Sequence, residues 1–137
     1  SLLLRSLALL NPSRFTQYLF NEVDVSALNP QVFRRQVLYV PPLPFDTAGL
    51  VKDYFLAPWQ LAVSKGQAPT SEHIDLLQRE GFWERAFHLL SSGEKQYVQI
   101  VRAFSLQPRV LMLDESMGHM DSSRRELVAQ WLGDSLH

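Results

Sequence analysis

Four consecutive apolar residues, 110–113, followed directly by two acids, Asp114 and Glu115, constrain this chain more than any other feature. A short run that is apolar at every position is typical of a strand in a parallel sheet, buried on both faces. Ligands of open α/β sheets bind at the carboxyl ends of such strands. We therefore expect a central strand that delivers two carboxylates to a binding site. A buried strand that simply enters a polar loop fits the same residues.

A second apolar run, residues 37–40, ends at two prolines and predicts another short strand. Helical patterns precede, separate and follow the two runs. They cover residues 1–10, 30–35, 49–62, 71–79 and 93–106, and a last helix that Gly133 is expected to end. The sequence thus predicts an α/β fold, a mostly parallel sheet flanked by helices, with a small inserted helical lobe.

The composition of the chain, its apolar first ten residues and its aromatic residues at 82, 83 and 87 lead to expectations about the core of the protein and about its binding partners. The chain has 137 residues, 46% of them apolar, which suits one domain. Residues 1–10 are apolar almost all round, so we expect that helix to be buried on several sides. The net charge of −1 gives no electrostatic footprint for nucleic acid, and we expect no such partner. In that neutral context Phe82, Trp83 and Phe87 are more typical of the core of the helical lobe than of a base-stacking platform.

Two loops contain helix-start signals. Ser91, followed three residues later by Glu94, fits a capping box. The free N–H groups and the dipole of the following helix also favour a bound anion, and the two interpretations are compatible. Asp121, before Ser122 and Ser123, fits an ordinary helix N-cap.

The motif Leu-Ser-Ser-Gly-Glu at residues 90–94, the strand ending in Asp114 and Glu115, and the later Asp121 together resemble the ATP-binding cassette (ABC) ATPases. The signature of that family is close to Leu-Ser-Gly-Gly-Gln/Glu, so Ser92 is the one departure within the five positions. The resemblance covers essentially the whole chain. It implies a P-loop NTPase-like fold.

The resemblance also divides the chain. It implies a partial ABC ATPase domain over residues 1–137, with a catalytic core at 1–43 and 107–137. Residues 44–106 are then the helical lobe, which includes the signature loop and its helix. Within the lobe, Pro-Trp-Gln at 58–60 is more weakly similar to bacterial iron-export ATP-binding subunits.

Family membership would assign a role to each candidate site residue. Glu115 is implied to accept the proton of the water that attacks the γ-phosphate, or to orient that water, and Asp114 to hold Mg²⁺ through a water. The residues implied to bind the γ-phosphate of ATP held by a second subunit are Ser91, Ser92 and Gly93. Asp121 is implied to couple the two sites of such a dimer, an alternative to its capping role.

Further features depart from the family pattern. The 137 residues contain no Gly-Lys phosphate loop, and Ser1 is expected to be the terminal hydroxyl residue of that loop and a Mg²⁺ ligand. Pro42 stands where the family has a Gln that reaches Mg²⁺ and the water, and Pro has no side-chain donor or acceptor. The sequence also ends before the family's switch histidine. We therefore expect the chain to be inactive alone.

The resemblance implies an ATP-binding subunit of an ABC exporter, which hydrolyses ATP with Mg²⁺ when intact. The implied partners are a second nucleotide-binding subunit, in a homodimer, and a membrane permease that holds the protein on the cytoplasmic face of the cell membrane. One alternative is a degenerate, non-hydrolysing cassette with a structural or regulatory role. Another is a DNA-maintenance ABC ATPase, which the absence of a long coiled-coil insertion and of a basic face disfavours.

Overall fold

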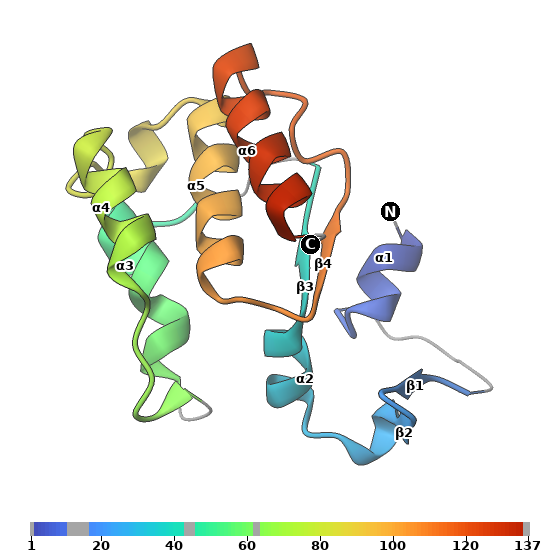
Figure 1. Cartoon of the computed structure of the whole chain (residues 1–137). Coiled ribbons are helices and arrows are strands. Elements are labelled where there is room, and N and C mark those ends of the chain that lie inside the picture. Colours follow the sequence, from blue (N-terminus) through green and yellow to red (C-terminus); the bar gives the residue numbers. More distant parts are fainter. Residues whose placement is uncertain (1, 11–16, 43–45, 62–63, 136–137) are drawn as a thin grey trace.

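The computed structural model of the chain describes residues 2–10, 17–42, 46–61 and 64–135. Helices precede, separate and follow its short strands (Figure 1). The helices and strands are α1 (Leu2–Leu7), β1 (Leu19–Phe20), β2 (Val23–Asp24), α2 (Pro30–Gln36), β3 (Val37–Val40), α3 (Val51–Leu56), α4 (Ser71–Arg79), α5 (Ser92–Ser105), β4 (Val110–Leu113) and α6 (Ser122–Ser135). In the part of the chain that the structure describes, no helix is both long and apolar enough to cross a membrane.

The two predicted strands, β3 and β4, form a parallel pair. Val37 lies opposite Val110, and Val40 opposite Leu113. Their carboxyl ends therefore meet at one edge, as the α/β prediction requires. A separate antiparallel hairpin, β1 with β2, was not predicted, because each strand is only two residues long and shows no periodicity.

Side chains of the parallel pair alternate between two apolar faces, as the pleat dictates. Val40 and Leu113 join the main core with α5 and α6. Val37 and Met112 join a smaller cluster around Phe33 of α2. Apolar side chains thus lie against both faces of the pair. The expectation of a central strand buried on both faces is not met by β4, because within the described residues it pairs only with β3, residues 111–113 are half-buried and Val110 is 40% exposed.

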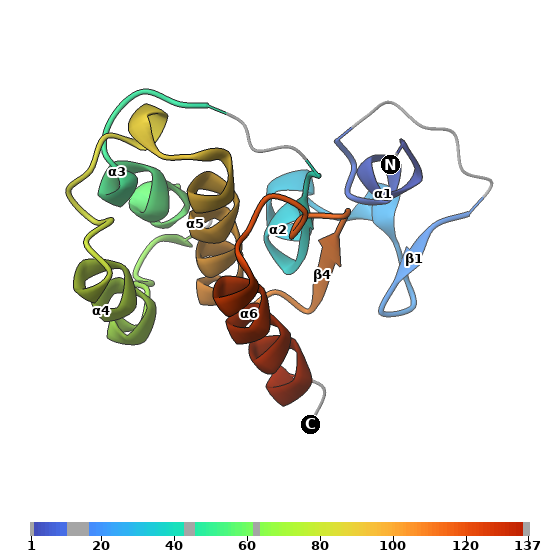
Figure 2. The same cartoon turned by 90° about the horizontal axis from the view of Figure 1, so that it is seen from above.

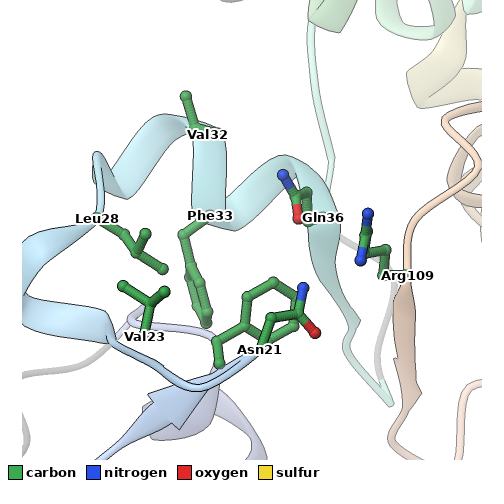
Figure 3. Close-up of a pocket in the computed structure, with 8 residues that line it drawn as sticks. Asn21, Val23, Leu28, Val32, Phe33, Gln36 and Arg109 are labelled. Carbon is green, nitrogen blue, oxygen red and sulfur yellow. The ribbon is translucent and has the colours of Figure 1, made fainter.

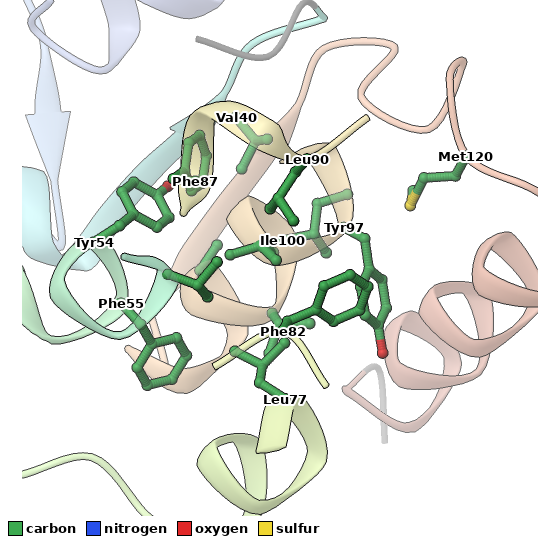
Figure 4. Close-up of a cluster of buried hydrophobic side chains, with 14 of the residues drawn as sticks. Val40, Tyr54, Phe55, Leu77, Phe82, Phe87, Leu90, Tyr97, Ile100 and Met120 are labelled. Atoms are coloured by element: carbon green, nitrogen blue, oxygen red, sulfur yellow. The ribbon is translucent and has the colours of Figure 1, made fainter. Parts of the chain in front are cut away.

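The main core continues from the helical lobe to the sheet without a break. Helix α5 lies between the lobe helices α3 and α4 on one side and the strand pair on the other (Figures 1 and 2). Aromatic side chains fill the lobe side of this core, among them Phe55, Phe82, Phe87 and Tyr97 (Figure 4). The assignment of Phe82 and Phe87 to the core is confirmed, and Trp83 packs against it, edge-on to Phe55.

The N-terminal helix differs from the prediction. It ends at Leu7 rather than residue 10, and Leu9 takes a left-handed φ of 57°. Burial on several sides is wrong for the described residues, because Leu3 is 63% and Leu10 48% exposed. Two contacts lie at the end of the helix: the Tyr18 hydroxyl donates to the Leu7 carbonyl at 2.6 Å, and Arg34 Nη2 donates to the Leu9 carbonyl at 2.6 Å.

Two other helix boundaries also differ. Gly133 does not end α6, which continues to Ser135, because a glycine stops a helix only where it adopts positive φ and Gly133 does not. The helix predicted over 49–62 is divided into α3 and a 3₁₀ turn, Ala57–Gln60. Pro58 is the cause, since it has no N–H to donate to the carbonyl of Tyr54, and Arg102 Nη1 donates there instead at 3.0 Å.

Candidate functional site

The carboxyl end of the strand pair positions Asp114. The backbone N–H of Asp114 donates to the Val40 carbonyl at 3.1 Å, which extends the ladder by one residue. The Tyr39 hydroxyl donates to Asp114 Oδ2 at 2.9 Å. Ser116, which is buried, donates its hydroxyl to the same Val40 carbonyl at 2.7 Å. The carboxylate of Asp114 is therefore half-buried at the end of β4, where the Tyr39 hydroxyl of β3 binds it and the Val40 carbonyl fixes the backbone on either side of Glu115.

Glu115 differs sharply from its neighbour. Its side chain is exposed, and its backbone has a φ of 51°. This left-handed conformation is uncommon for a residue with a Cβ and tends to occur at functional sites and tight turns. The hydrogen bonding of the strand pair therefore ends at Asp114, and the chain turns away so that Glu115 faces solvent.

The loop before α5 is an N-terminal cap. Ser91 Oγ accepts from the Glu94 backbone N–H at 3.1 Å, and Glu94 Oε1 accepts from the Ser91 N–H at 2.9 Å. The predicted capping box is thus confirmed. The pKa of Glu94 lies below its ordinary value, chiefly because its carboxylate accepts from the Ser91 N–H. Arg85 is a further donor to the same carboxylate. Ser92 and Gly93 occupy the first turn, whose remaining N–H groups are those that a helix offers to an anion.

Gln96 connects this helix start to both neighbouring loops, and sequence analysis assigned it no role. Its side chain is fully buried. Nε2 donates to the Pro42 carbonyl at 2.6 Å, and Oε1 accepts from the His119 backbone N–H at 3.2 Å. One signal in the sequence could have found it: Gln96 is a polar residue four positions before Ile100, so it lies on the same, buried face of the helix.

Gly93 packs directly on the loop that follows Glu115. A Cβ at this position would overlap the carbonyl oxygen of His119. The loop after β4 and the signature loop are therefore in backbone contact, and only glycine permits it. Together with Gln96, this contact brings residues 91–93, 114–115 and 42 to one end of the molecule.

Asp121 is the N-cap of α6. Oδ1 accepts from the Arg124 backbone N–H at 2.9 Å and from the Ser123 hydroxyl at 2.8 Å, while Oδ2 pairs with the Arg124 guanidinium at 2.9 Å. The Arg124 N–H, followed by the Ser123 hydroxyl, lowers the pKa of Asp121. The capping interpretation is confirmed. A coupling role across a dimer stays a prediction.

Asp114 and Glu115 are the carboxylates at the end of β4 that could hold a metal ion. Among the described residues, no group of three or more His, Cys, Asp or Glu side chains could hold an ion. Mg²⁺ does not need such a group, because it keeps several waters and binds substrate phosphates with one or two protein carboxylates. The fixed carboxylate of Asp114 meets that requirement. Ser1, the other predicted ligand, lies outside the described residues.

A cavity of about 260 Å³ lies away from this site (Figure 3). It is bounded by the β1–β2 hairpin, by Phe33 and Gln36 of α2, and by Arg109. Gln36 directly precedes β3, and Arg109 directly precedes β4. The cavity is therefore at the amino ends of the strands, opposite Asp114.

Three comparisons with known proteins bear on this arrangement. Residues 1–118 match the model of the ABC transporter family. The chain is 32% identical over 129 residues to "Probable iron export ATP-binding protein FetA" of Escherichia coli (strain K12), covering 91% of this chain and 56% of FetA. It is also 32% identical over 142 residues to the sulfate/thiosulfate import ATP-binding protein CysA of Xylella fastidiosa (strain Temecula1), covering 95% of this chain and 39% of CysA.

A solved structure has the same fold. The crystal structure of a cobalt transport ATP-binding protein, cbiO-2, superposes with a TM-score of 0.67 at 21% identity, over 97% of this chain and 49% of that one. The chain thus spans about half the length of the relatives that it matches.

Proposed function

The chain belongs to the ABC transporter family, and we propose that the whole protein is the ATP-binding subunit of a transporter, with Asp114 and Glu115 serving ATP hydrolysis. One observation carries the proposal. Gln96 and Gly93 tie the signature loop to the loops that follow β3 and β4, so the motifs of the family lie together at the carboxyl ends of the strands.

The two acids have different environments, which suit different tasks. Asp114 is half-buried and accepts from the Tyr39 hydroxyl, so its carboxylate is held in one position. This suits a carboxylate that would hold Mg²⁺ through a water. Bound with nucleotide, Mg²⁺ would neutralise charge on the phosphate oxygens. Glu115 is exposed, so a water can reach its carboxylate, which would accept the proton of the attacking water or orient it.

The signature loop supports a site that two subunits share. Ser91 uses its hydroxyl to cap α5, which leaves the N–H groups of Ser92 and Gly93 and the helix dipole for an anion. We assign them to the γ-phosphate of ATP on a second copy, with Asp121 at the same interface. The further partner is a membrane permease, which would hold the homodimer on the cytoplasmic face of the membrane.

The direction of transport is the finer part of the proposal. The name of FetA states iron export, and the name of CysA states sulfate and thiosulfate import. We retain export, because FetA combines 32% identity with a larger covered share of its own length than CysA does. Transport measured in right-side-out and inverted vesicles would decide between the two directions.

Pro42 supports a second candidate function, a cassette that binds ATP without hydrolysing it. Its carbonyl accepts from Gln96, and its side chain offers no polar group to a metal or a water. In that case the protein would act as a structural or regulatory partner of an active subunit.

The test is ATP turnover by the protein expressed with all residues that its gene encodes. We expect Glu115→Gln to retain ATP binding and to lower turnover by about 10²–10⁴-fold, the usual contribution of a general base. Asp114→Asn should instead weaken Mg²⁺-dependent nucleotide binding. Glu126→Gln, an exposed change on α6, is the matched control and should leave turnover unchanged.

The outcomes separate the two candidates. Wild-type turnover that Glu115→Gln abolishes supports the hydrolase. ATP binding with no turnover in either protein supports the non-hydrolysing cassette. Turnover that is equal in wild type and Glu115→Gln would contradict the role of Glu115.

A further inference from the structure

A small cavity lies between β3, α3 and α5, beside the site but separate from the acids. Its volume is about 80 Å³. Apolar side chains form most of the wall, and two polar side chains of α5 also line it, Gln99 and Arg102. No role in the proposed ATPase chemistry uses either residue.

Gln99 is buried with no hydrogen-bond partner. Only 4% of it is exposed, and neither Nε2 nor Oε1 is paired with a group in the described chain. Buried amides are almost always satisfied by protein or by a bound species, because burial removes their water. Gln99 therefore needs a ligand that both accepts from Nε2 and donates to Oε1.

Arg102, one helical turn after Gln99, supplies a positive charge. Its guanidinium lies over the Tyr54 ring at 3.8 Å, and Nη1 donates to the Tyr54 carbonyl. Among the described residues no carboxylate pairs with it within salt-bridge distance. Burial lowers the pKa of Arg102 and raises that of Tyr54 to about 12, as expected where charge is poorly solvated. A guanidinium in such a place normally has an anionic partner.

Size and chemistry restrict the ligand. One water needs roughly 10–15 Å³ of such a cavity, so about 80 Å³ admits a handful of heavy atoms and excludes a nucleotide. Water alone would satisfy the amide but would bring no charge to Arg102. A carboxylate or sulfate would pair with Arg102 but has no proton to donate to Oε1 of Gln99.

We propose that this cavity binds a small oxyanion that carries a hydroxyl group, of the hydrogenphosphate or hydrogencarbonate class. The anionic oxygens accept from Arg102 and from Nε2 of Gln99, and the hydroxyl donates to Oε1. Pro41 also lines the cavity and directly precedes Pro42. The ligand therefore links the lobe helices to the loop that follows β3. The proposal does not depend on ATP hydrolysis.

The test is titration of the full chain with inorganic phosphate, at constant ionic strength and in a buffer free of oxyanions. We expect saturable changes in the side-chain amide resonances of Gln99 by NMR, with a matching rise in the melting temperature. Sulfate should be weaker, because it has no hydroxyl at neutral pH. Hydrogencarbonate should behave as phosphate does.

Gln99→Leu keeps the volume and removes the amide, and it should lower phosphate affinity by about tenfold or more. Gln31→Leu, an exposed change on α2, is the matched control and should bind as wild type. Three results would overturn the proposal: unchanged Gln99 resonances with phosphate, equal effects of phosphate and sulfate, or full phosphate affinity in Gln99→Leu.

Discussion

Replacement of Gln96 by Leu is the sharpest test of how the site is held together. Leu has a similar volume but cannot donate to the Pro42 carbonyl or accept from the His119 N–H. The change removes both bonds while the apolar contacts of the buried position remain. Any loss of stability then reports the polar bridge between the three loops rather than a cavity.

The magnitude follows from the two bonds of Gln96. Each contributes about 0.5–1.5 kcal/mol, and a partner left buried without a bond costs about 1–3 kcal/mol. Both bonds are only part-buried, so water can reach the abandoned groups and the lower values apply. We expect Gln96→Leu to lower the free energy of unfolding by about 2 kcal/mol.

The assay is urea unfolding of wild type, Gln96→Leu and the exposed control Gln31→Leu. With a slope of roughly 2 kcal/mol per M, the midpoint of Gln96→Leu should fall by about 1 M with an unchanged slope. Gln31→Leu should unfold within about 0.5 kcal/mol of wild type. A Gln96→Leu midpoint equal to that of wild type would refute the bridge.

A second substitution at Gln96 makes the argument specific to hydrogen bonding. In Gln96→Glu, a protonated carboxyl can donate to Pro42 and accept from His119, whereas a carboxylate cannot donate. Burial raises the pKa of such a carboxyl above its unfolded value. The restored stability should therefore be complete below the unfolded pKa, near 4.3, and should be lost as the pH rises through the folded pKa. A pH-independent defect would contradict the hydrogen-bond account.

Two further predictions concern the signature loop. Gly93→Ala should cost about 1–3 kcal/mol, because its Cβ overlaps the His119 carbonyl, whereas Gly133→Ala, in open helix, should be neutral or stabilising by up to about 1 kcal/mol. Equal urea midpoints for the two variants would contradict the contact. Glu94→Gln should make the free energy of unfolding depend less on pH. The lowered pKa of Glu94 stabilises the folded wild type above the unfolded pKa, and this stabilisation is lost as the pH falls through the folded pKa. The difference in unfolding free energy between wild type and Glu94→Gln should thus shrink from pH 7 to pH 3, and a constant difference would contradict it.

The elements that sequence analysis predicted are those fixed by local chemistry. The strands at 37–40 and 110–113 are apolar at every position, and the caps at Ser91 and Asp121 depend on residues within three positions. The error at residues 1–10 lies where distant contacts decide. Whether the helix at 1–10 is buried depends on what packs around it, and its spacing of leucines carries no such information.

The same distinction applies to the candidate site. The residue types of Asp114, Glu115 and Gly93 were sufficient to make them candidates, because the chemistry proposed for each is in its own side chain or in the lack of one. Gln96 was not identified, since its importance lies in the Pro42 carbonyl and the His119 N–H, which are 54 and 23 residues away. A backbone group has no signature in the sequence.

The anchor on Pro42 also bears on how the site tolerates its most unusual residue. Gln96 binds the carbonyl of residue 42, and every amino acid has that group. This hydrogen bond is therefore available whatever the side chain at 42. Proline there removes a polar side chain from the site, but it leaves the connection from this loop through α5 to the loop after Glu115 intact. Position 42 can therefore change the chemistry at the carboxylates without changing how the three loops are held together.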